Sequence, residues 1–136
     1  MIRQGPLRLK AMVWFGDVTA FGPGKADLLE TIAQEESISA AGRKLGMSYR
    51  RCWMLVDTMN RCWREPVVAT FSGGGKQRGA RLTPLGEEVL AAYRRLERDL
   101  AVSAEGEPMA TLASLLKAAP DDKLTGGDEQ ATPGLG

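Results

Sequence analysis

The stretch that decides the fold begins at Ser37 and ends at Asn60, and it reads SISAAGRKLGMSYRRCWMLVDTMN. Two short helical patterns meet at Gly46-Met47-Ser48. Ser39 is placed to cap the first helix and Ser48 the second, because a serine hydroxyl can accept a hydrogen bond from a free amide of the opening turn. Gly46 suits the left-handed residue that ends the first helix. Two helices joined by so tight a turn predict a helix-turn-helix, whose second helix usually enters the major groove of DNA.

The second helix of this stretch has an apolar face and a basic face. At about 100° per residue, one side collects the apolar residues Cys52, Leu55, Val56 and Met59. Arg50 and Arg51 lie in the first turn, where the helix dipole disfavours positive charge. Paired arginines make sense there if they meet phosphates or guanine edges, which arginine binds with two hydrogen bonds. An ordinary solvated face is the alternative for an isolated pair, but the caps, the turn and the apolar stripe together favour DNA binding.

Charge is distributed unevenly along the 136 residues, although the net charge is only +1. Residues 37–83 contain nine Lys and Arg against two Asp and Glu, a net of +7. Residues 84–136 contain five against ten, a net of −5. The positive charge therefore lies on the predicted DNA-binding segment, and nothing in a purely assembly role calls for it.

Several classes of protein are excluded by composition. The chain has no histidine, no nucleophile beside a base and no metal-ligand cluster, which argues against an enzyme and against a metal site. Its two cysteines, Cys52 and Cys62, fall on one predicted helix about 15 Å apart, too far for a disulfide. We see no signal peptide and no apolar run near the roughly 20 residues of a membrane helix. A soluble cytoplasmic protein without a membrane partner is expected.

Before the central stretch, an alternating pattern predicts one half-buried strand from Leu7 to Phe15. One face would hold Leu7, Leu9, Ala11, Val13 and Phe15, and the other Arg8, Lys10, Met12 and Trp14. The segment from Lys25 to Glu36 reads as an amphipathic helix. We expect this helix to pack against the two helices of the turn motif and to close a three-helix core.

After the central stretch, a hairpin is predicted. Val67 to Phe71 is β-branched and aromatic, and residues 81–83 would form the returning strand. The loop between them reads SGGGKQRGA over residues 72–80 and carries Lys76 and Arg78. Such a glycine-rich "wing" can follow a phosphate backbone closely, because little side-chain bulk intervenes. A flexible loop with incidental charge is the alternative.

Thr83-Pro84 opens another helix, with Thr as cap and Pro at the first helical position, and the pattern runs to about Ala101. Its apolar residues recur every three or four positions, so the helix either covers the core or forms a dimer seam, and periodicity alone leaves both open. Residues 109–119 predict a weaker short helix, and residues 120–136 a disordered tail. The expected division is a domain over residues 1–101 and an appendage over residues 102–136.

Five groups of residues carry a resemblance to a known family. They are Ser37-Ile38-Ser39-Ala40-Ala41, Gly46-Met47-Ser48-Tyr49-Arg50 with Trp53, Met59-Asn60, Gly73-Gly74-Gly75-Lys76 and Leu82-Thr83-Pro84-Leu85-Gly86. They resemble the N-terminal winged-helix domain of molybdate-dependent transcriptional regulators (ModE type), which is similar to the DNA-binding domain of LysR-type regulators. The resemblance covers about residues 7 to 118.

The resemblance implies a homodimeric DNA-binding protein with the strand Leu7–Phe15 and the helix from Pro84 in the dimer interface. It implies that DNA is faced by Ser48, Tyr49, Arg50, Arg51 and Trp53, and that the wing residues Lys76 to Arg78 touch its backbone. Arg51 replaces the small residue expected at its position, so the preferred operator would differ. The family's molybdate-binding domains would follow the winged helix, and this chain ends in a short tail instead, so no cofactor is expected here.

The sequence therefore predicts a mostly α fold with a small β wing, a winged helix-turn-helix. The expected function is sequence-specific binding of double-stranded DNA and regulation of molybdate transport or other molybdenum-related genes, without molybdate-sensing domains. Arg50 and Arg51 would read bases, and phosphates would be contacted by Arg43, Lys44, Arg61, Lys76, Arg78 and Arg81. The alternatives are a LysR-like DNA-binding domain with other targets and a winged-helix module for protein assembly.

Overall fold

The computed structural model describes residues 1–72 and 78–124. In these residues the chain is mostly helical, with three small antiparallel hairpins, which confirms the predicted balance of helix and strand. The helices are α1 (Pro23–Glu35), α2 (Ile38–Leu45), α3 (Tyr49–Cys62), α4 (Pro84–Ala104) and α5 (Glu107–Ser114). The hairpins pair β1 (Ile2–Gln4) with β2 (Leu7–Leu9), β3 (Val13–Phe15) with β4 (Val18–Phe21), and β5 (Val68–Ser72) with β6 (Arg78–Leu82). None of the described helices is both long and apolar enough to cross a membrane.

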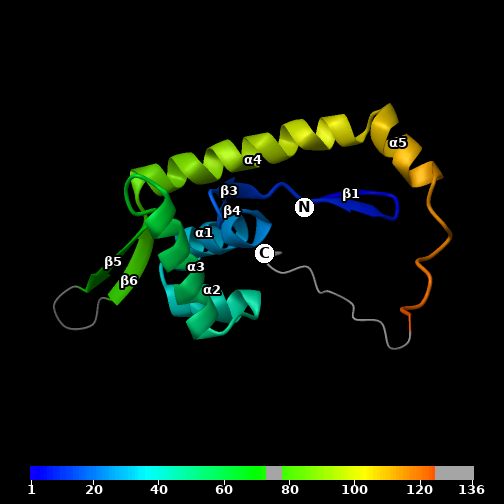
Figure 1. Ribbon diagram of the computed structural model, residues 1–136. Helices are drawn as coiled ribbons and strands as arrows, with labels where there is room; N and C mark the ends of the chain where they lie inside the picture. Colours follow the sequence, from blue (N-terminus) through cyan, green and yellow to red (C-terminus); the bar gives the residue numbers. More distant parts are fainter. Residues whose placement is uncertain (73–77, 125–136) are drawn as a thin grey trace.

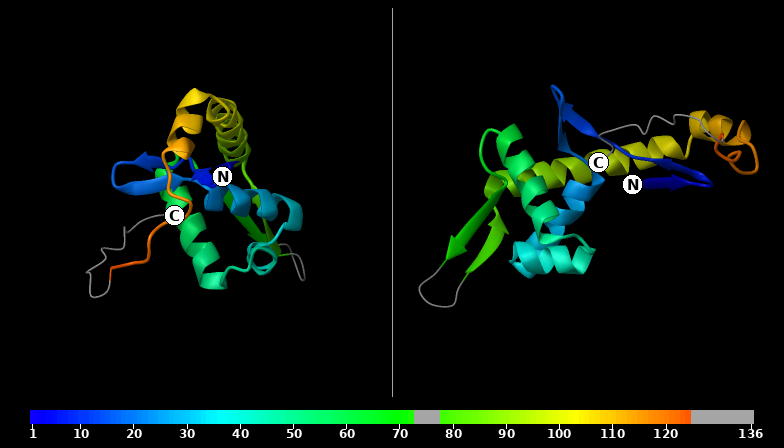
Figure 2. Two further views of the ribbon diagram at one scale, coloured as in Figure 1. Left: turned by 90° about the vertical axis from the view of Figure 1, so that its right-hand side faces the viewer. Right: turned by 60° about the horizontal axis from the view of Figure 1, so that its bottom comes forward.

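The helices are arranged in layers. Figure 1 shows the long α4 along one edge of the molecule, with α1 between α4 and α2. The β5–β6 hairpin projects from the body at the end where α4 begins, and α5 follows a bend at the other end of α4 (Figure 1). A turned view shows the β3–β4 hairpin as a second projection, directed away from the helices (Figure 2).

The core lies where α1, α2 and α3 meet, as the helical patterns predicted. Helix α1 contributes its fully buried Leu28, Leu29 and Ile32, and α3 contributes Cys52, Val56 and Met59. Leu55, the fourth residue of the predicted α3 stripe, is half-buried. Each apolar face alone would be exposed, so the three helices stabilise one another by removing these side chains from water.

Aromatic side chains join the three helices to α4. The ring of Phe21 in β4 meets Trp63 edge-on at a centroid distance of 6.4 Å and Tyr93 of α4 at 5.0 Å. The Tyr93 hydroxyl donates a hydrogen bond of 2.8 Å to the carbonyl oxygen of Ala11. Burial, together with the nearby Glu97 carboxylate, raises the pKa of Tyr93 to about 12, so this donor keeps its proton at physiological pH.

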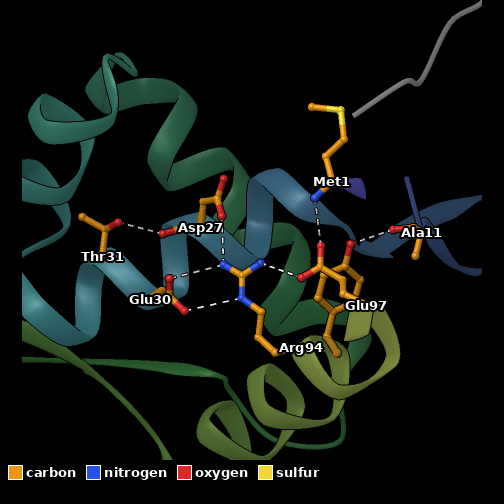
Figure 3. Close-up of polar contacts among 8 residues, drawn as sticks. Met1, Ala11, Asp27, Glu30, Thr31, Arg94 and Glu97 are labelled. Carbon is orange, nitrogen blue, oxygen red and sulfur yellow. Dashed lines mark hydrogen bonds and ion pairs between the residues drawn. The ribbon is translucent and has the colours of Figure 1, made fainter. Parts of the chain in front are cut away.

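A cluster of charged groups fixes α4 across α1 (Figure 3). The Arg94 guanidinium of α4 donates to Asp27 at 2.9 Å and to Glu30 at 3.4 Å, both on α1, and to Glu97 at 2.8 Å. Glu97 also accepts a 3.1 Å hydrogen bond from the Met1 ammonium group. Burial favours the neutral form of Glu97, but the hydrogen bonds from Arg94 and Met1 outweigh it and hold its pKa below the ordinary value. Charge-assisted bonds of this kind are the strong ones.

The prediction of one strand from Leu7 to Phe15 was wrong. Residues 10–12 lie outside any strand, and the two halves belong to separate hairpins, with Ile2 opposite Leu9 and Phe15 opposite Val18. Both hairpins turn at a glycine in the left-handed region, Gly5 at φ 57° and Gly16 at φ 62°. No glycine or proline interrupts the sequence from Leu7 to Phe15, so the pattern did not reveal the change of pairing partner.

Three element boundaries also differ from the predictions. Ser37, not Ser39, caps α2: its hydroxyl accepts from the Ala40 amide at 3.1 Å. The returning strand begins at Arg78 instead of residue 81, because the pairing with β5 extends to Ser72. Helix α4 runs to Ala104, three residues past Ala101, since nothing in that segment breaks a helix, and α5 then begins earlier than residue 109.

Candidate nucleic-acid interface

The turn between α2 and α3 has the chemistry that the sequence predicted. Gly46 adopts φ 70° and ends α2, and the Met47 amide donates to the Gly42 carbonyl oxygen at 2.8 Å. Ser48 then caps α3, since its hydroxyl accepts from the Arg51 amide at 3.1 Å. The amides of Met47 and Arg51 are therefore satisfied within the corner itself, which helps to fix the direction of α3 relative to α2.

Close packing holds the two helices together. A Cβ atom added to Gly42 would lie 2.7 Å from the Cys52 sulfur and 3.2 Å from the Met47 carbonyl oxygen. Only a glycine fits at this point of α2 without displacing its neighbours. Burial raises the pKa of Cys52, which keeps this thiol neutral, as expected of a small core residue.

The exposed face of α3 carries the predicted DNA-facing residues. Tyr49 and Trp53 are 60% and 38% exposed, and their rings meet edge-on at 6.0 Å. Arg50 and Arg51 are also exposed, and within the described residues neither guanidinium group makes an ion pair. The pKa of Lys25 on α1 is lowered, first by burial of its ammonium group and second by the positive charge of Arg51. The first turn of α3 thus carries positive charge that other residues of the described chain leave unneutralised.

The cations predicted to contact phosphates are distributed around this face. Arg43 is exposed, Lys44 pairs with Glu35 at 3.3 Å, and Arg61 pairs with Asp57 at 3.0 Å. Exposed ion pairs contribute about 0–1 kcal/mol, so these two cations can exchange their partners for phosphate at little cost.

The β5–β6 hairpin is attached firmly at its base. The Asn60 side chain accepts a 2.7 Å hydrogen bond from the Val67 amide where the chain leaves α3, and the Ala80 amide of β6 donates to the Glu36 carbonyl oxygen at 3.0 Å. Arg81, a predicted phosphate contact, is exposed, with its guanidinium carbon 4.8 Å from the centre of the Phe71 ring. This cation–π contact orients Arg81 without neutralising it.

Two predicted wing residues remain untested. Lys76 lies outside the described residues. The backbone of Arg78 begins β6, but its side chain is also outside the described part.

A groove of about 560 Å³ separates α3 from the hairpin. Tyr49 and Trp53 line one wall and Thr70, Phe71 and Ser72 the other, while Ser37 and Ser39 form its end at the start of α2. The sequence reasoning missed Thr70, Ser72 and the two serines as site residues. Thr70 and Ser72 alternate with Phe71 along β5, which was the available signal, but only the fold reveals that α2 meets them at one groove.

The groove is suited to an anionic, extended ligand. Hydroxyl groups and the indole of Trp53 can donate hydrogen bonds to it. The exposed Arg50 and Arg81 follow directly, in the sequence, the lining residues Tyr49 of α3 and Ala80 of β6. Within the described residues, no group of three or more His, Cys, Asp or Glu is placed to hold a metal ion.

Comparisons with known proteins agree on one group of relatives, although no family model matches the chain. The chain is 42% identical over 80 residues to the molybdenum-pterin-binding protein MopB of Rhodobacter capsulatus, covering 59% of this chain and 30% of that protein. It is 39% identical over 79 residues to the molybdenum transport protein ModE of Azotobacter vinelandii, covering 58% and 29%. It is 32% identical over 71 residues to the DNA-binding transcriptional dual regulator ModE of Escherichia coli, covering 52% and 27%.

These relatives are named as regulators or molybdenum-related proteins and not as enzymes. The chain spans less than a third of the length of each of the three relatives, so their whole activities are not carried over to it. Over more than half of its length, this chain is a homologue of the ModE and Mop proteins, which confirms the resemblance to the ModE type. Its correspondence to their N-terminal DNA-binding domain stays a prediction.

Proposed function

We propose that this chain binds double-stranded DNA in a sequence-specific manner and regulates transcription. In this proposal α2 and α3 act as a helix-turn-helix, the β5–β6 hairpin acts as the wing, and residues 1–101 form the DNA-binding domain. The observation that carries it is the first turn of α3, where Arg50 and Arg51 are exposed and make no ion pair within the described residues. Stability alone would favour acidic residues at that end of a helix, so a polyanionic partner explains the pair best.

The proposed contacts divide into two kinds. Arg50 and Arg51 read base edges, where arginine binds guanine through two hydrogen bonds, and Ser48, Tyr49 and Trp53 lie beside the same groove of the DNA. The surrounding cations contact phosphates and set the position of the protein without reading sequence; they are Arg43, Lys44, Arg61, Lys76, Arg78 and Arg81. The DNA strand that leaves the major groove at α3 would then pass along the protein surface groove between α3 and the β5–β6 hairpin.

The proposed assembly is a homodimer, the state that the family resemblance implies, and a two-fold protein of this kind would match a two-fold operator. The N-terminal strands and α4 supply its interface. The proposed targets are genes of molybdate transport or other molybdenum-related functions, since relatives carry the names ModE and molybdenum transport protein. No catalytic role and no molybdate-sensing role are assigned to this chain.

Selection of bound sites from random double-stranded DNA tests the proposal most directly. We expect enrichment of a palindromic site, and we expect the same site with and without molybdate because sensing is not assigned to this chain. A LysR-like domain with other targets would enrich a site that is absent from the upstream regions of molybdenum-related genes. Failure to enrich any sequence would contradict specific DNA binding.

A salt titration separates DNA binding from a role in protein assembly. If six to ten phosphates are contacted, affinity should fall by about 10³–10⁵ between 50 mM and 200 mM salt. A double variant, Arg50→Ala with Arg51→Ala, should flatten this dependence, and Glu107→Ala on α5 serves as a matched control outside the interface. An affinity that does not respond to salt would contradict the phosphate contacts and favour the assembly alternative.

A further inference from the structure

The first turn of α1 holds a charge that none of the described residues neutralises. Lys25 is only 5% exposed, yet its ammonium group has no hydrogen bond or ion pair within the described residues. The nearest carboxylate along the helix, that of Asp27, is paired with Arg94 of α4 at 2.9 Å. Burial of an unpaired charge costs free energy, so stability does not explain a lysine without a counter-ion at this place.

The ammonium group of Lys25 reaches the surface although the rest of its side chain is enclosed. Among the described residues, the buried side-chain nitrogen or oxygen atom without a hydrogen-bond partner is Nε1 of Trp63. The Lys25 nitrogen also lacks a partner but is not fully buried, so it keeps contact with solvent. Lysine commonly buries its methylene groups in this way and leaves the charge accessible. A ligand at the surface can therefore meet this charge.

Backbone donors at the same place are free as well. Helix α1 begins at Pro23 after Gly22, which has no side chain to cap it, and the first turn has no acidic residue. Within the described chain, the amides of Gly24 and Lys25 donate to no acceptor, and a Cβ atom on Gly24 would meet nothing within 4 Å. Side chains of a helix lean toward its N-terminus, which directs that of Lys25 toward these amides. Free amides and a partial positive charge at a helix N-terminus bind anions.

This turn lies on the side of α3 opposite the β5–β6 hairpin. Tyr49 and Trp53 face the hairpin across the groove, and Arg51 lies about 200° around the helix from Tyr49. Arg51 and Cys62 are separated by about three turns plus 20°, so they share that opposite side. Burial lowers the pKa of Lys25, Arg51 lowers it further and Cys62 raises it, so both residues lie within electrostatic reach of the ammonium group. Lys25 therefore lies along the far side of α3.

We propose that the first turn of α1 binds a phosphate of the DNA strand that lies across the major groove from the strand at the hairpin. The Lys25 ammonium group and the amides of Gly24 and Lys25 donate to the phosphate oxygens, and Arg51 adds positive charge beside them. The inference rests on the proposed function and adds to it a contact on the other side of α3. With the β5–β6 hairpin on one DNA backbone and α1 on the other, α3 is held in the major groove from both sides.

Replacing Lys25 by methionine separates binding from stability. Methionine is nearly as long and has no charge, so the free energy of unfolding should stay equal or rise, which urea unfolding checks. Binding to the selected DNA site should weaken about tenfold, as expected for the loss of a hydrogen bond from a charged group. Lys117→Met is the matched control, because it removes the same charge from an exposed position after α5.

The salt dependence of DNA affinity gives the first measurement. Each phosphate neutralised by a cation contributes about 0.9 to the slope of log affinity against log salt. Between 50 mM and 200 mM salt, Lys25→Met should therefore lose roughly 3.5-fold less affinity than the unmodified chain, whereas Lys117→Met should lose as much as the unmodified chain. An unchanged slope for Lys25→Met would overturn the contact even if its affinity is lower.

DNA with single methylphosphonate linkages locates the contact, because each linkage removes one phosphate charge. The selected site is scanned along both strands with the unmodified chain, Lys25→Met and Arg81→Ala. One linkage should weaken binding of the unmodified chain but not that of Lys25→Met, and it should lie on the strand opposite the linkage coupled to Arg81. A Lys25-coupled linkage on the same strand as that of Arg81, or none at all, would contradict the proposal. Lys25→Gln, which keeps a polar group, is used if methionine impairs folding.

Control outcomes distinguish failure of this inference from failure of the proposed function. If the unmodified chain binds no DNA, both fail together. If it binds the selected site and Lys25→Met behaves as Lys117→Met does, the inference alone fails. Calorimetry with inorganic phosphate in place of DNA tests a free anion: phosphate binding that Lys25→Met abolishes, with unchanged DNA affinity, would assign the first turn of α1 to a free anion and overturn the DNA contact.

Discussion

Gly42→Ala tests the close packing of α2 on α3, which fixes the orientation of α3 relative to α2. The new Cβ atom would lie 2.7 Å from the Cys52 sulfur, a separation at which neighbouring atoms must move. Overpacking of this kind costs about 1–3 kcal/mol, and the gain in helix propensity from Gly to Ala returns about 1 kcal/mol. We expect a net loss of up to about 2 kcal/mol in the free energy of unfolding.

The steric cost becomes visible when the sulfur is removed. In the background of Cys52→Ala, the main obstruction is gone, and Gly42→Ala should be close to neutral or stabilising. The coupling between the two substitutions should therefore be about 1–3 kcal/mol in favour of the double variant. Gly24→Ala on α1 is the matched control, because its Cβ atom would meet nothing within 4 Å and it reports propensity alone.

Urea unfolding followed by circular dichroism measures these free energies, with an unchanged m value as the sign that only stability has altered. Cys52→Ala alone should also destabilise, since it leaves a small cavity in a fully buried place. The reasoning is refuted if Gly42→Ala stabilises the protein as much as Gly24→Ala does, with no coupling to Cys52→Ala. That result would mean that α2 and α3 do not touch at this point.

Three further predictions concern other parts of the molecule. Arg50→Ala should weaken binding to the selected site by about 1–3 kcal/mol and relax specificity, whereas Lys76→Ala should weaken all sequences alike; equal losses on specific and random DNA for Arg50→Ala would defeat base reading. Glu97→Gln should cost about 1–2 kcal/mol at pH 7. Because the pKa of Glu97 is lowered from 4.5, this stability is present above that pH and is lost as the pH falls through the lower folded value. The urea midpoints of the two proteins should therefore converge as the pH is lowered below 4.5, and a constant gap would contradict the assignment. Gly86→Ala places a Cβ atom 2.1 Å from the Val67 carbonyl oxygen, so thermal unfolding should show a loss of about 3 kcal/mol, and a stability equal to the unmodified protein would contradict this contact.

Most of the helices could be predicted from interactions between residues that are close together in the sequence. The caps at Ser48 and Thr83, the left-handed Gly46 and the apolar stripe of α3 all act within a few residues of one another, so they could be predicted from the chain alone. The error at α2 has the same origin: Ser37 and Ser39 are both good caps, and their hydroxyls lie 3.2 Å apart, so the sequence alone did not decide between them.

The features that the sequence did not predict depend on distant residues. Arg94 and Asp27 are 67 positions apart, and no periodicity relates them. The break between β2 and β3 is likewise not marked in the sequence, because no glycine or proline lies between Leu7 and Phe15. For the candidate interface, the exposure of Arg50 and Tyr49 followed from helical geometry, but the groove that Tyr49 shares with Thr70 required knowledge of where β5 lies.

The hydrogen bond from the Ala80 amide to the Glu36 carbonyl oxygen affects how the proposed wing would be placed against DNA. Among the described residues, Glu36 is the non-glycine residue with a positive φ, at 55°, and it forms the corner that leads into α2. The hydrogen bond from Ala80 therefore attaches the β5–β6 hairpin to the corner at which α2 begins. The distance between α3 and the base of the hairpin is thus set by folding and not by DNA binding. Binding would then lose less conformational entropy, because these elements are already ordered. If this chain binds DNA, a fixed spacing between α3 and the hairpin would also select duplexes by shape. A duplex whose backbone spacing differs would have to deform, and its binding should weaken even when every contacted base is unchanged.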